Sequence, residues 1–94
     1  MTVQLRVPPA LRELCGGQAV QHISVVEGAT VADLLDTVAL AHPALERRIR
    51  DERGVLRPHV NVFVGEDNIR ALAGAATVLR SGQEVSILPA ISGG

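Results

Sequence analysis

The last two residues, Gly93 and Gly94, carry the group with the clearest chemical potential in this sequence. They follow a strand-like run over 84–91 and would end the chain in a backbone carboxylate flanked by no side chain. An α-carboxyl group has a pKa of about 3.3–3.7, so it is ionised at neutral pH and can attack a phosphate, but it donates its acyl group only after activation. Glycine also permits close backbone approach inside a narrow active site. We therefore expect Gly94 to be the reacting end of the chain.

Other reactive side chains do not form a recognisable site in the sequence. His22, His42 and His59 are far apart, with no cysteine or carboxylate at metal-ligand spacing. No Ser-His-Asp order and no phosphate-binding glycine loop appears either. We expect the histidines at strand surfaces or helix ends, and we expect no catalytic residue, no metal site and no bound cofactor.

Composition indicates one small globular domain. The chain has 94 residues, of which 47% are hydrophobic, enough to bury a core without metals or disulfides. Cys15 is the only cysteine, so no intramolecular disulfide can form, and we expect a buried or half-buried thiol. The sequence from Met1 shows neither a basic leader with an apolar core nor an apolar run of membrane-spanning length. We expect a cytoplasmic protein with no membrane partner.

The charge pattern argues against nucleic acid as a partner. The formal net charge is -1 and Phe63 is the only aromatic residue, so neither a basic face nor a stacking surface is expected. All nine basic side chains are arginines, which offer no nucleophilic amine at ordinary pH. Copies of the chain therefore cannot be linked through their own side-chain amines. As a separate expectation, the protein is a monomer when it is alone.

Hydrophobic periodicity predicts two strands and a helix in the first half. Apolar residues alternate over 2–7 and again over 22–25, which is typical of half-buried strands forming a hairpin. Thr30 followed by Asp33 has the form of a capping box, and apolar residues then recur at helical spacing until His42-Pro43. The apolar stripe of this helix is expected to cover a sheet.

The second half predicts a charged helical extension and three further strands. Residues 44–53 place Glu46/Arg50, Arg47/Asp51 and Arg48/Glu52 at i,i+4, which indicates a solvated helical face. Strands are expected over 60–64 and 84–89, with a turn at 65–68 and a short strand at Ile69-Arg70 between them. Residues 71–79 are expected to cross over as a loop with one short helical turn.

The element order, with one main helix packed on one face of a mixed four- to five-stranded sheet, predicts an α+β domain over 1–89, followed by a flexible tail over 90–94. Side chains alternate across a strand, so burying Val60, Val62 and Val64 against the helix turns the intervening residues to the other face. An exposed apolar patch there would mark an interaction site. The alternative is that loop 71–80 shelters the patch. The expected partner-binding surface consists of His59, Asn61, Phe63 and Leu88.

The whole chain resembles the β-grasp, ubiquitin-like sulfur-carrier proteins. That family includes the small subunit of molybdopterin synthase and the carriers of thiamin and cysteine biosynthesis, and the likeness is greatest to the actinobacterial cysteine-biosynthesis carrier. The resemblance rests on the helix entry over 28–35, the strand over 60–64, Leu79 with Ser81-Gly82 and Val85, and above all Ile87-Leu88-Pro89-Ala90-Ile91-Ser92-Gly93-Gly94.

The resemblance implies a β-grasp fold and a role as cosubstrate. A ubiquitin-activating-like enzyme that uses ATP would adenylate Gly94, and sulfur would then replace AMP to leave a thiocarboxylate. A sulfur-accepting synthase would consume it, in cysteine biosynthesis or alternatively in molybdopterin, thiamin or thio-modified metabolite synthesis. Fully extended, the five tail residues Ala90, Ile91, Ser92, Gly93 and Gly94 reach at most roughly 17 Å. A ubiquitin-like protein modifier and a plain interaction domain are the competing functions.

Overall fold

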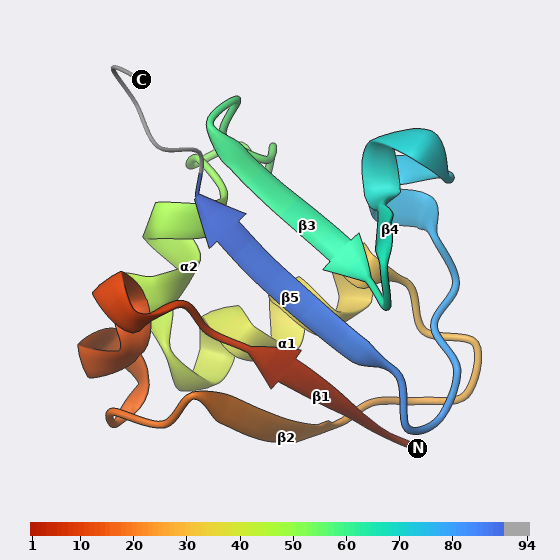
Figure 1. The fold of residues 1–94 in the computed structure, drawn as a ribbon, viewed down its shortest axis with the longest axis horizontal. Helices are drawn as coiled ribbons and strands as arrows, with labels where there is room; N and C mark the ends of the chain where they lie inside the picture. The colour runs from red at the N-terminus through yellow and green to blue at the C-terminus, as the bar shows by residue number, and fades with distance from the viewer. Residues whose placement is uncertain (90–94) are drawn as a thin grey trace.

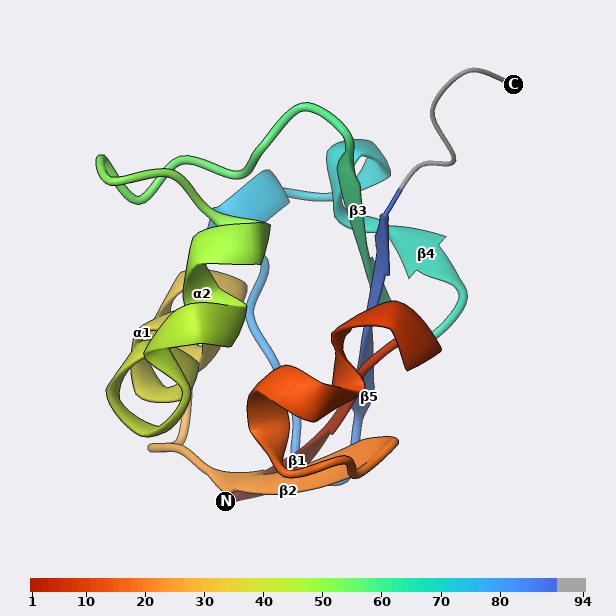
Figure 2. The same cartoon turned by 90° about the vertical axis from the view of Figure 1, so that its left-hand side faces the viewer.

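The structure is a computed structural model that describes residues 1–89, and these form a five-stranded mixed sheet with two α-helices on one face (Figure 1, Figure 2). The strands are β1 (Thr2–Arg6), β2 (Val20–Ser24), β3 (Val60–Val64), β4 (Asp67–Asn68) and β5 (Glu84–Pro89). The helices are α1 (Val31–Ala41) and α2 (Pro43–Ile49), with three short 3₁₀ helices, η1 (Pro9–Cys15), η2 (Ile69–Ala71) and η3 (Gly74–Ala76).

The sheet has the spatial order β2-β1-β5-β3-β4. The central pair, β1 and β5, is parallel, whereas β1–β2, β5–β3 and β3–β4 are antiparallel. The first and last strands within residues 1–89 are therefore neighbours in the middle of the sheet. This confirms the expected α+β class and the β-grasp fold. The sheet has five strands, within the expected four to five.

The core lies between the sheet and the two helices, which Figure 2 shows as separate layers. Alternate residues of β1, β3 and β5 face the helices, as the period of two in the sequence predicts. Burying a large apolar side chain contributes about 1.5–3 kcal/mol relative to leaving it exposed, so this layer dominates the stability. Its fully buried members include Val3, Leu5, Val62 and Ile87 from the sheet and Leu34, Leu35, Leu45 and Ile49 from the helices.

The start of α1 is fixed by the capping box that the sequence predicts. The Oγ1 of Thr30 accepts a hydrogen bond from the backbone N–H of Asp33 at 3.2 Å, and the Asp33 carboxylate accepts one from the backbone N–H of Thr30 at 2.9 Å. Two otherwise unpaired donors are thereby satisfied. His42 ends the helix, because Pro43 begins α2 in a new direction.

The expected charged extension over 44–53 is a separate, shorter helix, and the prediction of a solvated face is wrong for Arg50. Helix α2 folds back against α1 and ends at Ile49, and Arg50 lies buried at 9% exposure. Its guanidinium donates to Glu46 at 2.6 Å and, across the helix pair, to Asp36 at 2.9 Å. A helical spacing pattern cannot reveal a partner 14 residues away on another helix.

The short strand lies two residues earlier than predicted. Asp67 and Asn68 pair with the end of β3, while Ile69-Arg70, the predicted strand, lies in η2. The Oδ1 of Asn68 accepts the backbone N–H of Arg70 at 2.9 Å, which favours a turn over an extended chain.

The crossing loop lies on the helix side of the sheet. The backbone N–H of Val31 donates to Thr77 at 3.0 Å, and that of Leu79 donates to Ala29 at 2.8 Å, which ties the loop to the start of α1. The alternative in which residues 71–80 shelter the apolar patch is wrong for Leu88, which is 46% exposed.

Candidate partner-binding surface

The sheet face opposite the helices carries two apolar side chains, Phe63 and Leu88, towards the C-terminal end of β5. In the antiparallel pairing of β3 with β5, Asn61 lies directly opposite Leu88, and Phe63 lies opposite Ser86. Leu88 is 46% exposed and Phe63 is half-buried. We call these four residues the helix-free surface. The sheet face without helices is turned towards the viewer in Figure 1. The predicted exposure of Leu88 is confirmed.

The helix-free surface lies beside the point at which the chain continues towards its end. Val60, the first residue of β3, pairs with Pro89, the last described residue. His59 is exposed in the turn that precedes β3, next to this pair but outside the strand. The predicted tail over 90–94, with Gly94 as the expected reacting end, lies outside the described residues.

Arg70 is a member of the site that the sequence did not predict. Its guanidinium donates from Nη1 to Oδ1 of Asn61 at 2.7 Å and from Nη2 to the carbonyls of Pro58 and Val60 at 3.2 and 3.3 Å. The amide of Asn68 also donates to Oδ1 of Asn61 at 3.3 Å. These bonds fix the start of β3 and orient the Asn61 side chain next to Leu88. The only sequence signal was an arginine following a turn.

A second charged contact borders the same face. Arg6 lies beside Ser86 in the parallel pair of β1 with β5, and its Nε donates to Oε1 of Glu84 at 3.1 Å. Both side chains are substantially exposed, so solvent screening leaves this pair with little net stabilising energy. The helix-free surface thus has an apolar centre with an ion pair on the β1 side and Arg70 on the β4 side.

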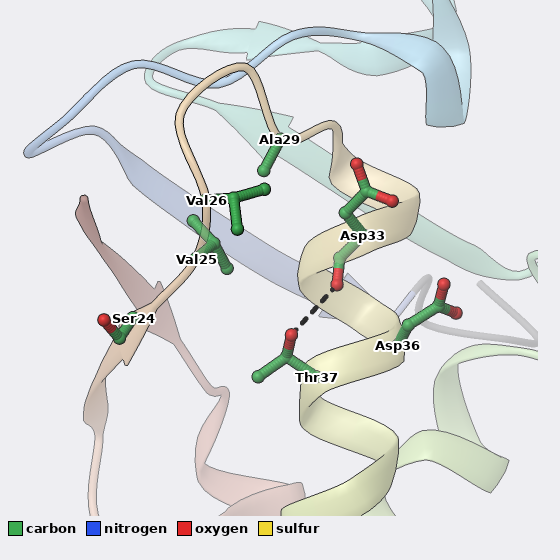
Figure 3. Close-up of a pocket in the computed structure, with 7 residues that line it drawn as sticks. All are labelled: Ser24, Val25, Val26, Ala29, Asp33, Asp36 and Thr37. Atoms are coloured by element: carbon green, nitrogen blue, oxygen red, sulfur yellow. Dashed lines mark hydrogen bonds between the residues drawn. The ribbon is translucent and has the colours of Figure 1, made fainter.

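The hollows of the molecule lie away from this surface. One of about 470 Å³ opens between β2 and the first turns of α1, and Figure 3 shows Ser24 and Val25 on one side of it and Asp33 and Thr37 on the other. A second hollow, of about 300 Å³, is lined by His22 and His42 among other residues. Within residues 1–89, however, no three histidine, cysteine or carboxylate side chains gather as metal ligands.

Cys15 is buried, as expected, at the end of η1. Burial raises the pKa of its thiol above the ordinary value, outweighing the lowering by Gln21 and by Arg12. A raised thiol pKa disfavours the reactive thiolate at neutral pH. Of the helices in the described part of the chain, none is both long and apolar enough to cross a bilayer.

The sequence of this chain is similar to those of small carrier and modifier proteins. The model of the ThiS family matches residues 5–94. Small archaeal modifier protein 1 of Haloferax volcanii is 39% identical over 84 residues, covering 89% of this chain and 91% of that protein. The sulfur carrier protein CysO of Mycobacterium tuberculosis is 31% identical over 96 residues and aligns over all of both chains.

Solved structures agree with the sequence relatives. The crystal structure of SAMP1 from Haloferax volcanii superposes with a TM-score of 0.85 at 31% identity and covers all of both chains. The Amycolatopsis orientalis BexX/CysO complex contains a chain that matches with a TM-score of 0.82 at 30% identity, covering 98% of this chain and 99% of that one. This chain therefore shares its fold with these solved structures over nearly the whole of both chains.

Proposed function

The chain belongs to the ThiS family, and we propose that it is a sulfur carrier whose Gly94 carboxylate is loaded by one enzyme and unloaded by another. Both enzymes bind the folded domain over residues 1–89, and the chain performs no catalysis itself. Its relatives are named as a sulfur carrier protein and as a small archaeal modifier protein.

Loading requires two steps that balance without a redox reagent. The Gly94 carboxylate attacks the α-phosphorus of ATP in a ubiquitin-activating-like enzyme, which forms an acyl adenylate and releases pyrophosphate. Hydrosulfide then attacks the acyl carbon, and AMP and one proton leave. The product is a thiocarboxylate whose sulfur is a good nucleophile, whereas the starting carboxylate is a poor acyl donor without this activation.

The observation that carries the proposal is the position of the helix-free surface. Leu88 is exposed one residue before the last described position, on a face that the crossing loop leaves open. Five residues follow Pro89, and an extended chain of that length spans at most about 17 Å. An enzyme that binds Leu88 can therefore have its reacting centre within reach of Gly94.

We propose cysteine biosynthesis as the pathway that receives the sulfur. The support is the match to CysO, which runs over the full length of both chains and includes the Gly-Gly end. A sulfur-accepting synthase would bind the loaded carrier and take the sulfur onto an electrophilic carbon. The corresponding test is to offer the purified thiocarboxylate form to candidate synthases and to identify the one that consumes it.

Intact-mass spectrometry tests the carrier function directly. Protein isolated from its own host, or incubated with the activating enzyme, ATP and a sulfur source, is expected to include a species in which one oxygen is replaced by sulfur. Deleting Gly94 is expected to abolish that species. Its absence from the full-length protein under these conditions would contradict the proposal.

A protein modifier is the second candidate, because the relative from Haloferax volcanii is named a small archaeal modifier protein. In that case the activated Gly94 would be joined to lysines of other proteins. Covalent ladders in host extracts that require Gly94 would favour this function, and their absence alongside a thiocarboxylate would exclude it. If removal of Gly93 and Gly94 left the biological activity unchanged, the chain would instead act as a plain interaction domain.

A further inference from the structure

We propose that the free edge of β2, together with the hollows between β2 and α1, binds an extended peptide that adds to the sheet as an antiparallel strand. The peptide would carry one basic and two apolar side chains at alternate positions. This site is separated from β5 by β1, so it is distinct from the helix-free surface and goes beyond the carrier function.

The backbone of β2 has hydrogen-bonding groups directed away from the sheet. Strand β2 is the outermost strand, and at the two ends of its pairing Ala19 and Val25 each bond to the β1 side at 2.8 Å. In an antiparallel pair the residues alternate between facing the partner strand and facing away from it. Val20, His22 and Ser24 therefore direct their N–H and C=O groups to the free edge.

This edge lacks the features that normally protect an outer strand. Proteins shorten such strands or place charges and proline on them, because a free edge is a template for pairing with another chain. The opposite edge strand, β4, is only two residues long. In contrast, β2 has five residues, Val-Gln-His-Ile-Ser, without a proline or any of Asp, Glu, Lys and Arg.

The two hollows described above are neighbours along this edge, because they share lining residues. The larger lies beside the end of β2 and the smaller beside its middle, and Ser24 and Thr37 line both. We call the combined feature the β2–α1 groove. Figure 3 shows its wider end, with Thr37 on α1 facing across to β2. Volumes of about 470 and 300 Å³ are of the size that accommodates side chains of a ligand.

The alternation of β2 determines which peptide side chains enter the groove. Gln21 and Ile23 pair with the buried Leu5 and Val3, so their side chains lie on the helix side of the sheet. Peptide residues opposite them project to the same side, because directly opposed residues share a face. The lining of the smaller hollow includes the apolar Ile23, Val38 and Ala41 beside polar residues such as Thr37 and His42. An apolar peptide side chain can pack on the apolar part of this lining.

The charge at the wider end favours a basic side chain opposite Val25. Asp33 lines this end together with Val25, and within residues 1–89 no arginine forms an ion pair with its carboxylate. Asp36, by contrast, is already paired with Arg50. A second copy of the chain is a poorer occupant, because its own β2 offers no cation to Asp33.

Amide exchange measured by NMR tests this proposal with an end-blocked peptide of the sequence Lys-Thr-Val-Thr-Val. Antiparallel addition places the lysine opposite Val25 and the valines opposite Ile23 and Gln21. At saturating peptide, the amides of His22 and Ser24 are expected to exchange at least about tenfold more slowly. The amide of Ile23, already paired with β1, is expected to remain unchanged.

Two matched peptides separate strand addition from simple apolar binding. N-methylation of both threonines removes the donors that face β2 and is expected to abolish binding, whereas N-methylation of both valines removes donors that face away and leaves binding intact. Equal inhibition by both modifications would overturn the proposal. So would chemical-shift changes confined to the helix-free surface, or sedimentation showing that free β2 edges pair into a dimer.

The variant Asp33→Asn tests the charge preference. Asparagine retains an oxygen that can accept from the Thr30 N–H and so keeps the capping interaction, while the charge is lost. The wild-type protein is expected to prefer the lysine peptide over its glutamine analogue by about two- to fivefold, the range for an exposed ion pair. The variant is expected to show no preference, and a retained preference would overturn the assignment of Asp33. Deletion of Gly94 is expected to leave peptide binding unchanged, so failure here is distinguishable from failure of the carrier function.

Discussion

The Nη1 atom of Arg70 lies 2.7 Å from Oδ1 of Asn61, the residue directly opposite Leu88 in the sheet. This bond, with those to the carbonyls of Pro58 and Val60, links η2 to the strand that carries the helix-free surface. Arg70 therefore positions the surface without being part of its apolar centre.

We predict that Arg70→Met lowers both stability and partner binding. The substitution removes the bonds to Asn61 and to the backbone before β3, and we expect the free energy of unfolding to fall by about 1 kcal/mol. Urea denaturation measures this change, and the rate of thiocarboxylate formation at low carrier concentration measures binding. Arg80→Met is the matched control, because Arg80 is exposed and lies outside β3, in the turn before β5. Equal effects of the two variants would contradict the positioning role.

Leu88→Ser is predicted to impair loading while leaving the fold intact. Leu88 is 46% exposed, so truncation loses little core packing, but a central apolar contact with the activating enzyme would be removed. We expect loading at subsaturating carrier to slow by about tenfold or more. Leu40→Ser on α1, where the leucine is 89% exposed, serves as the control and is expected to load normally. Normal loading of the Leu88 variant would exclude the helix-free surface as the enzyme contact.

Arg50→Met is predicted to be strongly destabilising. The arginine is paired with Glu46, which is only 16% exposed. The hydrogen bonds that Arg50 donates to the Glu46 carboxylate are the main reason why the pKa of the Arg50 guanidinium lies above its ordinary value. Removing one partner of a buried ion pair leaves the other charge uncompensated and costs about 3 kcal/mol. Thermal and urea unfolding measure the loss.

The exposed Arg48→Met variant provides the comparison for Arg50→Met and is expected to change stability by less than about 0.5 kcal/mol. Adding Glu46→Gln to Arg50→Met is expected to restore part of the lost stability, because the buried charge is then absent. If the double variant were no more stable than Arg50→Met alone, packing rather than the buried ion pair would explain the effect.

Cys15 is predicted to react slowly with alkylating reagents in the folded protein. Its pKa is raised by burial, so the protonated thiol is favoured on folding. This stabilising contribution is present below the unfolded thiol pKa of about 8.5 and is lost as the pH rises through the higher folded value. Stability is therefore expected to decline in alkaline solution, and less so for Cys15→Ala.

Mass spectrometry after timed alkylation checks the reactivity of Cys15. In the loaded carrier we expect the Gly94 thiocarboxylate to be alkylated first, with Cys15 modified at a rate that follows unfolding and rises in urea. Rapid labelling of Cys15 at neutral pH in the folded chain would show that the thiol is accessible and would contradict the prediction.

Much of the fold follows from local patterns. The capping box at Thr30, the stop at Pro43 and the period of two over 60–64 are all short-range features, and each is confirmed. The exposure of Leu88 followed from the same alternation. The predictions at Ile69-Arg70 and over 44–53 were wrong. The structure there depends on side-chain hydrogen bonds, which the spacing of apolar residues does not reveal.

The sequence by itself determined which faces of the strands are apolar and that no intramolecular disulfide can form, and it led to the prediction that Gly94 is the reacting end. Only the tertiary structure decided the partners of Arg50 and Arg70, the position of the crossing loop and the free edge of β2. The physical reason is the separation along the sequence between the residues that interact. Alternation and capping act between residues a few positions apart, whereas these contacts join segments that meet only when the helices pack onto the sheet.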